Sequence, residues 1–259
     1  MSEIFLTDTH AHLNDEAFDE DRDEVISSLK GKLRWVINNG YDLPSSEMSV
    51  ELSEKYDLIY AAVGMHPHDS RLYDDGFEKR LMELLKHPKV VAVGEIGLDY
   101  HYDLSERDVQ REVFIRQLKI ASDVRLPSTI HTRDAAEDTY RILKEHLTGE
   151  RGAVLHSFSQ SREMLKLYLD MNVCFSVSGS ITFKNADKLR EAVRLIPLER
   201  MFIETDCPYL TPVPFRGKRN CSDLVEHTAR VAAELKGVSY ESFLETVCDN
   251  AERFFDIGR

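Results

Sequence analysis

The chain has 259 residues, with 33 basic and 46 acidic side chains and a formal net charge of −13. This balance argues against a protein coated in basic residues for nucleic acid, although it leaves room for a local basic site. No apolar run reaches the ~18 residues that span a membrane, and no basic amino-terminal segment indicates a signal peptide. The four cysteines form no Cys-x-x-Cys pair, which is typical of the reducing cytosol. We therefore expect a cytoplasmic protein with no membrane partner.

Short apolar runs alternate with longer segments of helical periodicity along the whole chain. The runs predict eight strands, over Ile4–Asp8, Leu33–Asn38, Leu58–Val63, Val90–Gly94, Leu126–His131, Gly152–His156, Val173–Val177 and Met201–Glu204. The segments between them predict helices over Asp19–Lys30, Ser45–Tyr56, Phe77–Lys86, Ser105–Val124, Ala135–Leu147, Ser161–Met171 and Ala186–Ile196, with a last helical region over Ser222–Phe255. Near-continuous β-branched runs are typical of buried parallel strands.

Eight strand-then-helix units in about 260 residues match an α/β fold of the (β/α)8 TIM-barrel type. The alternative is an open doubly wound sheet, which often has a glycine-rich turn after its first strand. Here the first strand runs instead into Asp8-Thr9-His10-Ala11-His12. No linker rich in proline, glycine or serine divides the chain, so we predict a single domain over residues 1–259.

Ligand-type side chains lie at the ends of most of the predicted strands. The carboxyl ends of barrel strands share one rim, where barrel active sites sit, so residues far apart in sequence would converge there. Asp8 ends the first strand, and His66 and His68 follow the third. The remaining residues of this kind are His10, His12, Glu95, His131, His156 and Asp206.

These six residues predict a metal site. His10 and His12 are two positions apart on a strand, so both imidazoles point to one side. One buried histidine at a strand end is often a hydrogen-bonded core residue, but four histidines and two carboxylates would be costly to bury without partners. The nitrogen and oxygen donors suit Zn²⁺, Mn²⁺, Fe²⁺ or Mg²⁺ in hydrolysis. Six ligands exceed the three of a typical catalytic zinc, so we expect two ions bridged by Glu95.

Other residues near this rim suggest roles in catalysis and substrate binding. Asp206 can ligate metal or accept a proton from a metal-activated water, whereas Glu204 is predicted to be a structural carboxylate. Cations at the rim could hold phosphates, although each one alone is typical of a solvated loop. For Tyr100, His101 and Tyr102, base stacking and loop packing both remain open. The rim cations are Arg133, Lys184, Arg216, Lys218 and Arg219.

Several segments match one known family in order along nearly the whole chain. They are Asp8-Thr9-His10-Ala11-His12-Leu13, Gly64-Met65-His66-Pro67-His68, Gly94-Glu95-Ile96-Gly97-Leu98-Asp99-Tyr100, Val109-Gln110-Arg111-Glu112, His131-Thr132-Arg133-Asp134-Ala135, Thr182-Phe183-Lys184-Asn185-Ala186, Glu204-Thr205-Asp206-Cys207-Pro208-Tyr209-Leu210, Arg216-Gly217-Lys218-Arg219-Asn220 and Asn250-Ala251. On these residues the chain resembles the TatD-like metal-dependent deoxyribonucleases, a branch of the amidohydrolase-like barrels.

The resemblance implies a barrel that hydrolyses phosphodiester bonds in DNA, often as a Mg²⁺-dependent 3′-to-5′ exonuclease preferring single strands. It also implies that His66 lies near the substrate phosphate, and it assigns the metal to His10, His12, Glu95, His131, His156 and Asp206. The chain departs from the family pattern at Ser128-Thr129, Ser157-Phe158-Ser159-Gln160 and Cys221-Ser222. None of these departures removes a metal residue.

Three functional hypotheses follow. The first is a divalent-metal-dependent DNA hydrolase using Mg²⁺, Mn²⁺ or Zn²⁺, with Asp206 and Glu95 as its catalytic residues. The second is a barrel hydrolase of C–N bonds or small-molecule phosphate esters. Such enzymes often bridge their metals with a modified lysine from the fourth strand, but Lys89 lies at the opposite end of that strand. The third is a scaffold without activity. No long apolar heptad pattern suggests an obligate partner, so we expect a monomer.

Overall fold

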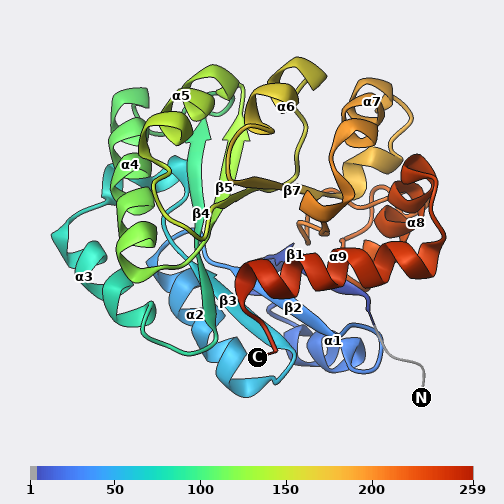
Figure 1. The fold of residues 1–259 in the computed structure, drawn as a ribbon. Coiled ribbons are helices and arrows are strands. Elements are labelled where there is room, and N and C mark those ends of the chain that lie inside the picture. The colour runs from blue at the N-terminus through green and yellow to red at the C-terminus, as the bar shows by residue number, and fades with distance from the viewer. Residues whose placement is uncertain (1–4, 259) are drawn as a thin grey trace.

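A computed structural model describes residues 5–258 of the chain. Eight parallel strands lie side by side in sequence order and form a nearly closed barrel, with helices around it (Figure 1). This arrangement confirms the predicted (β/α)8 architecture. The strands are β1 (Thr7–Ala11), β2 (Trp35–Asn39), β3 (Ile59–Val63), β4 (Val90–Asp99), β5 (Ser128–Arg133), β6 (Ala153–Leu155), β7 (Val173–Val177) and β8 (Met201–Ile203).

The helices lie close to their predicted positions. They are α1 (Arg22–Leu29), α2 (Leu43–Lys55), α3 (Asp75–Leu84), α4 (Arg107–Val124), α5 (Ala136–His146), α6 (Arg162–Tyr168), α7 (Asp187–Leu195), α8 (Val225–Lys236) and α9 (Tyr240–Phe255). Short 3₁₀ helices are η1 (Glu16–Phe18), η2 (Pro67–Leu72), η3 (Gly179–Thr182), η4 (Leu198–Arg200) and η5 (Ser222–Leu224). The last helical region divides into α8 and α9 because Gly237 ends α8 with a positive φ of 66° and Ser239 caps α9.

The first and fourth predicted strands differ most from the structure. Ile4, the first residue of the first predicted run, lies outside the described residues, and β1 begins at Thr7. The predicted Val90–Gly94 run ended too early, because β4 continues to Asp99, and Glu95 therefore lies within this strand. The extension pairs Gly97 with His131 of β5. Gly97 has a φ of 142°, and a Cβ there would lie 2.0 Å from the His131 carbonyl oxygen, so only glycine fits this pairing.

The barrel closes where β1 meets the segment after β8. The His12 amide donates to the Cys207 carbonyl (2.8 Å), and the Asp206 amide donates to the His10 carbonyl (2.9 Å). At the end where the strands begin, α9 lies across the barrel (Figure 1) and packs Phe255 among interior side chains such as Trp35 and Phe202. The opposite end, where the strands finish, is left for polar residues. No described helix is long and apolar enough to span a membrane.

Candidate metal centre

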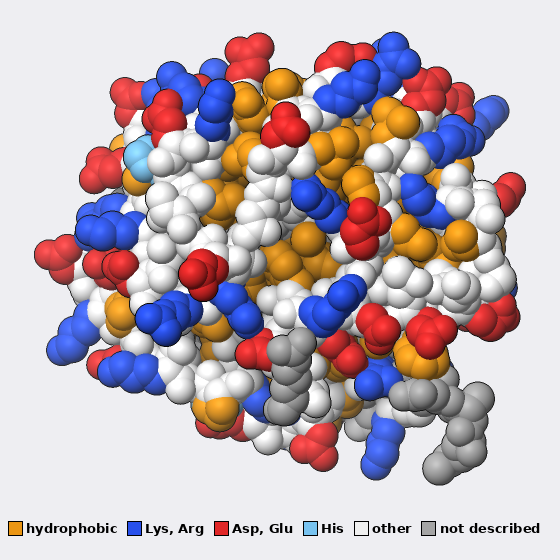
Figure 2. Space-filling model, in the orientation of Figure 1, with side chains coloured by type: hydrophobic (Ala, Val, Ile, Leu, Met, Phe, Trp, Pro, Cys, Tyr) orange, Lys and Arg blue, Asp and Glu red, His pale blue; other side chains and the backbone are white. Residues whose placement is uncertain are grey.

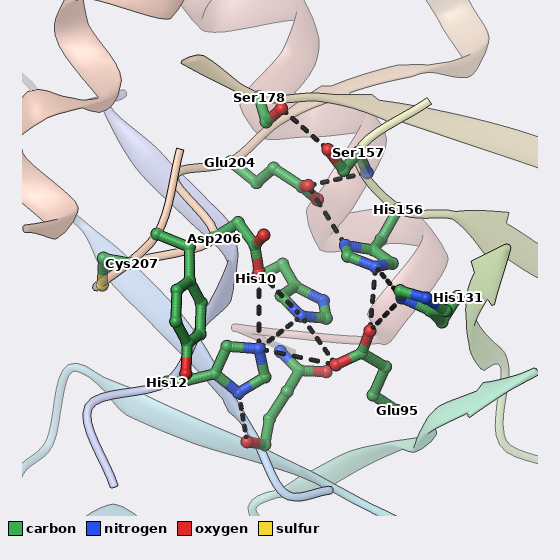
Figure 3. Close-up of polar contacts among 12 residues, drawn as sticks. His10, His12, Glu95, His131, His156, Ser157, Ser178, Glu204, Asp206 and Cys207 are labelled. Carbon is green, nitrogen blue, oxygen red and sulfur yellow. Dashed lines mark hydrogen bonds and ion pairs between the residues drawn. The ribbon is translucent and has the colours of Figure 1, made fainter. Parts of the chain in front are cut away.

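Glu95 lies at the middle of a buried cluster of imidazoles (Figure 3). Its Oε2 is 3.4 Å from Nε2 of both His10 and His12. Its Oε1 is 2.9 Å from Nδ1 of His131 and 2.9 Å from Nε2 of His156. One carboxylate therefore presents one oxygen to each of two histidine pairs.

The first pair follows from the geometry of β1. Because His10 and His12 point to the same side of the chain, their Nε2 atoms approach to 3.1 Å. His12 Nδ1 donates to the Asn39 carbonyl (3.0 Å), which fixes the ring and leaves Nε2 facing the cluster. Asp206 completes this side, with its Oδ1 3.4 Å from His12 Nε2 and 3.7 Å from His10 Nε2.

The second pair is held by carboxylates behind it. His131 Nε2 lies 3.0 Å from Oδ2 of Asp99. His156 Nδ1 lies 3.3 Å from Oε1 of Glu204, which also accepts a hydrogen bond from the Ser157 amide (2.7 Å). These carboxylates orient the rings so that their other nitrogens face Glu95.

Burial and charge act in opposite directions on the titratable groups here. Burial raises the pKa of Glu95, but the positive charges of His156 and His10 outweigh it and hold that pKa well below its usual value. Burial lowers the pKa of His131, but hydrogen bonds to Asp99 and Glu95 outweigh it and raise the pKa. Burial also lowers the pKa of His156, but the charges of Glu95 and Glu204 outweigh it and raise that pKa well above its usual value. A cation bound among these imidazoles would compete with protons for the same nitrogens.

These side chains fit a metal centre. His10, His12 and Glu95 each offer a ligand atom within 4.8 Å of the others, as do His66, Glu95 and His131. The Nδ1 atom of His10 is buried and makes no hydrogen bond with any described residue. The Oε2 atom of Glu204 is likewise buried and makes no hydrogen bond with any described residue. The donors are imidazoles and carboxylates, which suit a hydrolytic divalent cation.

Residues outside the six predicted ligands also belong to this cluster. His66, which follows the third predicted strand and for which the resemblance implies a place near phosphate, has its Nε2 3.7 Å from Oε1 of Glu95. Asp99 was not singled out in the sequence, yet its Oδ2 also lies 3.0 Å from Nε2 of His68. Its place four residues after Glu95, on the same face of one strand, could have indicated it. Asp8 lies apart, and it accepts hydrogen bonds from the amide and hydroxyl of Thr205, tying β1 to the segment after β8.

The predicted phosphate-binding cations around this rim differ in whether they form an ion pair with a described residue. Arg219 is paired with Asp21 through two hydrogen bonds (2.8 and 2.6 Å) and lies over the Phe18 ring. Arg216 lies over the Phe183 ring at 3.9 Å and makes no ion pair with any described residue. The same absence of a described ion-pair partner holds for Arg133, Lys184 and Lys218. Four of the five cations thus keep an uncompensated charge.

One cavity beside this rim is lined largely by carboxylates. A cavity of about 960 Å³ lies between η1 and the segment after β8, and its lining includes Asp15, Asp19, Asp21 and Tyr209. The Tyr209 ring also contacts His12, with ring centroids 6.3 Å apart. On the face drawn in Figure 2, basic and acidic side chains are interspersed and form no basic stripe. At the rim itself, the cations without an ion-pair partner among the described residues are the charges that could attract an anion.

The chain is similar to several known proteins over nearly its whole length. It is 46% identical to the uncharacterized metal-dependent hydrolase YabD of Bacillus subtilis, covering 98% of this chain and all of that protein. It is 32% identical to the 3′-5′ ssDNA/RNA exonuclease TatD of Escherichia coli, with 98% and 100% covered. The crystal structure of YJJV, a TatD homologue from Escherichia coli, superposes with a TM-score of 0.92 at 27% identity, covering 98% of each chain. Barrel, cluster and relatives together define a metal-dependent hydrolase.

The family can be stated more closely. A family model described as TatD related DNase matches residues 7–256. The chain therefore belongs to the TatD-related DNase family, as the motifs around His10, Glu95 and Asp206 predicted.

Proposed function

We propose that this protein is a deoxyribonuclease that removes nucleotides from the 3′ end of single-stranded DNA with the help of two divalent cations, Mg²⁺, Mn²⁺ or Zn²⁺. The observation that carries the proposal is the two-sided contact of Glu95, with one oxygen toward His10 and His12 and the other toward His131 and His156. A bridging carboxylate of this kind suits in-line attack on a phosphodiester. The exonuclease named among the relatives supports the substrate class.

The ligand set divides between the two sides of Glu95. His10, His12 and Asp206 would hold one cation, and His131 and His156 would hold the other. When bound, such ions neutralise phosphate charge and lower the pKa of water to roughly 7.

Asp206 is positioned to handle a proton. Its side chain is 14% exposed at the mouth of the cluster, and hydrogen bonding by His12 outweighs its burial and lowers its pKa. It is therefore charged at neutral pH and can accept a proton from the attacking water. Burial holds the pKa of His66 well below its usual value, so this neutral ring can share a hydrogen bond with a phosphate oxygen.

The rim cations would position the strand. Arg133, Lys184, Arg216 and Lys218 keep uncompensated charges and would contact phosphates. Arg219 is expected to contribute less, because Asp21 already neutralises it.

The test is digestion of end-labelled single- and double-stranded DNA and RNA by metal-stripped protein, restored with each cation in turn. We expect stepwise shortening from the 3′ end of single strands, and little of it without a cation. Asp206→Asn at saturating metal should lose most of the activity. Hydrolysis of amide substrates with none of nucleic acid would overturn the proposal.

One observation weighs against the C–N hydrolase hypothesis. Such enzymes would place a lysine from β4 between the metals, but the Lys89 ammonium donates to the Ser53 and Tyr56 carbonyls (2.7 and 2.9 Å) at the other end of the strand. The position facing the histidines on β4 is Glu95.

A further inference from the structure

Tyr102, in the loop after β4, differs from Tyr100 and Tyr209 at this rim. The hydroxyl of Tyr100 bonds to Asp138, and the hydroxyl of Tyr209 bonds to Asp15. The Tyr102 hydroxyl makes no hydrogen bond with any described residue, and the side chain is 54% exposed. An aromatic ring left in solvent without a polar anchor is available for stacking.

The backbone of Tyr102 is tied to the metal centre. Its amide donates to Oδ1 of Asp99 (2.9 Å), and Oδ2 of the same carboxylate lies 3.0 Å from His131 Nε2. The Tyr102 ring is nearly perpendicular to the rings of His68 and His101, at 5.3 and 5.0 Å between centroids. His68 also bonds to Asp99. One buried carboxylate therefore fixes this ring relative to a side chain of the cluster.

Arg133 accompanies the ring. Its guanidinium lies over the Tyr102 ring, 4.9 Å from the centroid, and no described carboxylate forms an ion pair with it. Arg133 ends β5, two residues after His131. Leu104 and Leu72 extend the exposed apolar surface away from the cluster, and the Arg71 side chain joins their segments through the Leu104 carbonyl (2.7 Å).

We propose that Tyr102 and Arg133 form a stacking platform for the nucleobase beside the scissile phosphate. The ring takes the base, and the uncompensated guanidinium takes an adjacent phosphate oxygen. A base can stack there only when it is not held in a duplex, so the platform gives the enzyme its preference for unpaired strands. This inference rests on the proposed nuclease function and identifies the part of the substrate that is recognised.

The test combines one variant with one substrate change. A set of single-stranded oligodeoxynucleotides is prepared in which one residue near the 3′ end is abasic, at a different position in each oligonucleotide. The kcat/KM of the wild type and of Tyr102→Ala is measured on each of them. At one position the abasic residue should slow the wild type roughly 5- to 150-fold, the equivalent of ~1–3 kcal/mol for one stacked base. Tyr102→Ala should lose the same factor on the intact strand and nothing further on the abasic one. It should also cleave single and double strands at more similar rates.

Control variants separate recognition from damage. Tyr102→Phe keeps the ring and should behave as wild type, whereas Leu195→Ala removes an exposed apolar side chain on α7, outside the site, and should change neither ratio. If Tyr102→Ala keeps the wild-type ratio between intact and abasic strands, the platform is wrong. If the wild type cleaves no nucleic acid with any cation, the proposed function itself has failed.

Discussion

Replacing Glu95 by glutamine tests whether one carboxylate serves two cations. Glutamine keeps the shape but has only one acceptor oxygen, so an amide NH₂ must face either the His10 and His12 nitrogens or the His131 and His156 nitrogens. Removing one partner of a buried charged pair costs roughly 3–5 kcal/mol. At 1.36 kcal/mol for each factor of ten, the affected side should bind its cation on the order of 10²- to 10⁴-fold more weakly.

The assay is metal content by equilibrium dialysis, followed by calorimetric titration of metal-stripped protein. At a concentration that gives the wild type two ions per chain, Glu95→Gln should hold one. Its kcat/KM on single-stranded DNA should fall by at least the factor lost in binding. Two ions bound with wild-type affinity would refute the bridging role, whatever happened to activity.

Three further predictions test the surroundings of this centre. Glu204→Gln should still bind two ions, but roughly 10- to 100-fold more weakly in calorimetric titration, because Glu204 orients His156 through Nδ1; unchanged affinity would mean that packing alone orients this ring. Arg133→Gln should flatten the plot of log K against log salt for single-stranded DNA by ~0.7, whereas Arg219→Gln should change it less because of Asp21; fluorescence anisotropy at several salt concentrations would detect equal slopes, which contradict this distinction. When the free cation is at about 100 times its dissociation constant, removing it should lower the free energy of unfolding by ~2.7 kcal/mol and the Tm by roughly 5–10 °C. A calorimetric Tm that does not change on adding chelator would show that no cation binds the folded state preferentially.

The strands and the gathering of polar residues could be predicted because they depend on local periodicity. The apolar runs gave eight strands, and the two-residue spacing of His10 and His12 placed both rings on one side of β1. The end of β4 could not be predicted in this way. Its extension to Asp99 depends on pairing with the neighbouring strand β5, which needs the close contact of Gly97 with the His131 backbone.

The state of each charged side chain was also beyond the sequence. In the sequence, Arg219 and Arg133 look alike as loop cations. In the structure, Arg219 pairs with Asp21, 198 positions away in the chain, whereas Arg133 lies over the Tyr102 ring. Ion pairing of this kind depends on which loops meet at the rim. For Tyr102, the sequence leaves base stacking and loop packing open. In the structure its ring contacts His68 and Arg133, and its hydroxyl makes no hydrogen bond with any described residue, so base stacking stays a prediction.

The net charge of −13 therefore says little about substrate by itself. Among the buried carboxylates, Glu95, Asp99 and Glu204 face imidazoles rather than solvent, so they do not repel an approaching phosphate as surface acids would. On the Tyr209 side, surface acids surround the cavity between η1 and the segment after β8. The uncompensated cation Arg133 lies on the other side, near His131. Asp134, Glu137 and Asp138 line one pocket together with Arg133, so acidic side chains lie on both sides of this rim. Under the proposed function, single local cations rather than a basic surface would therefore guide a phosphate to the metal centre.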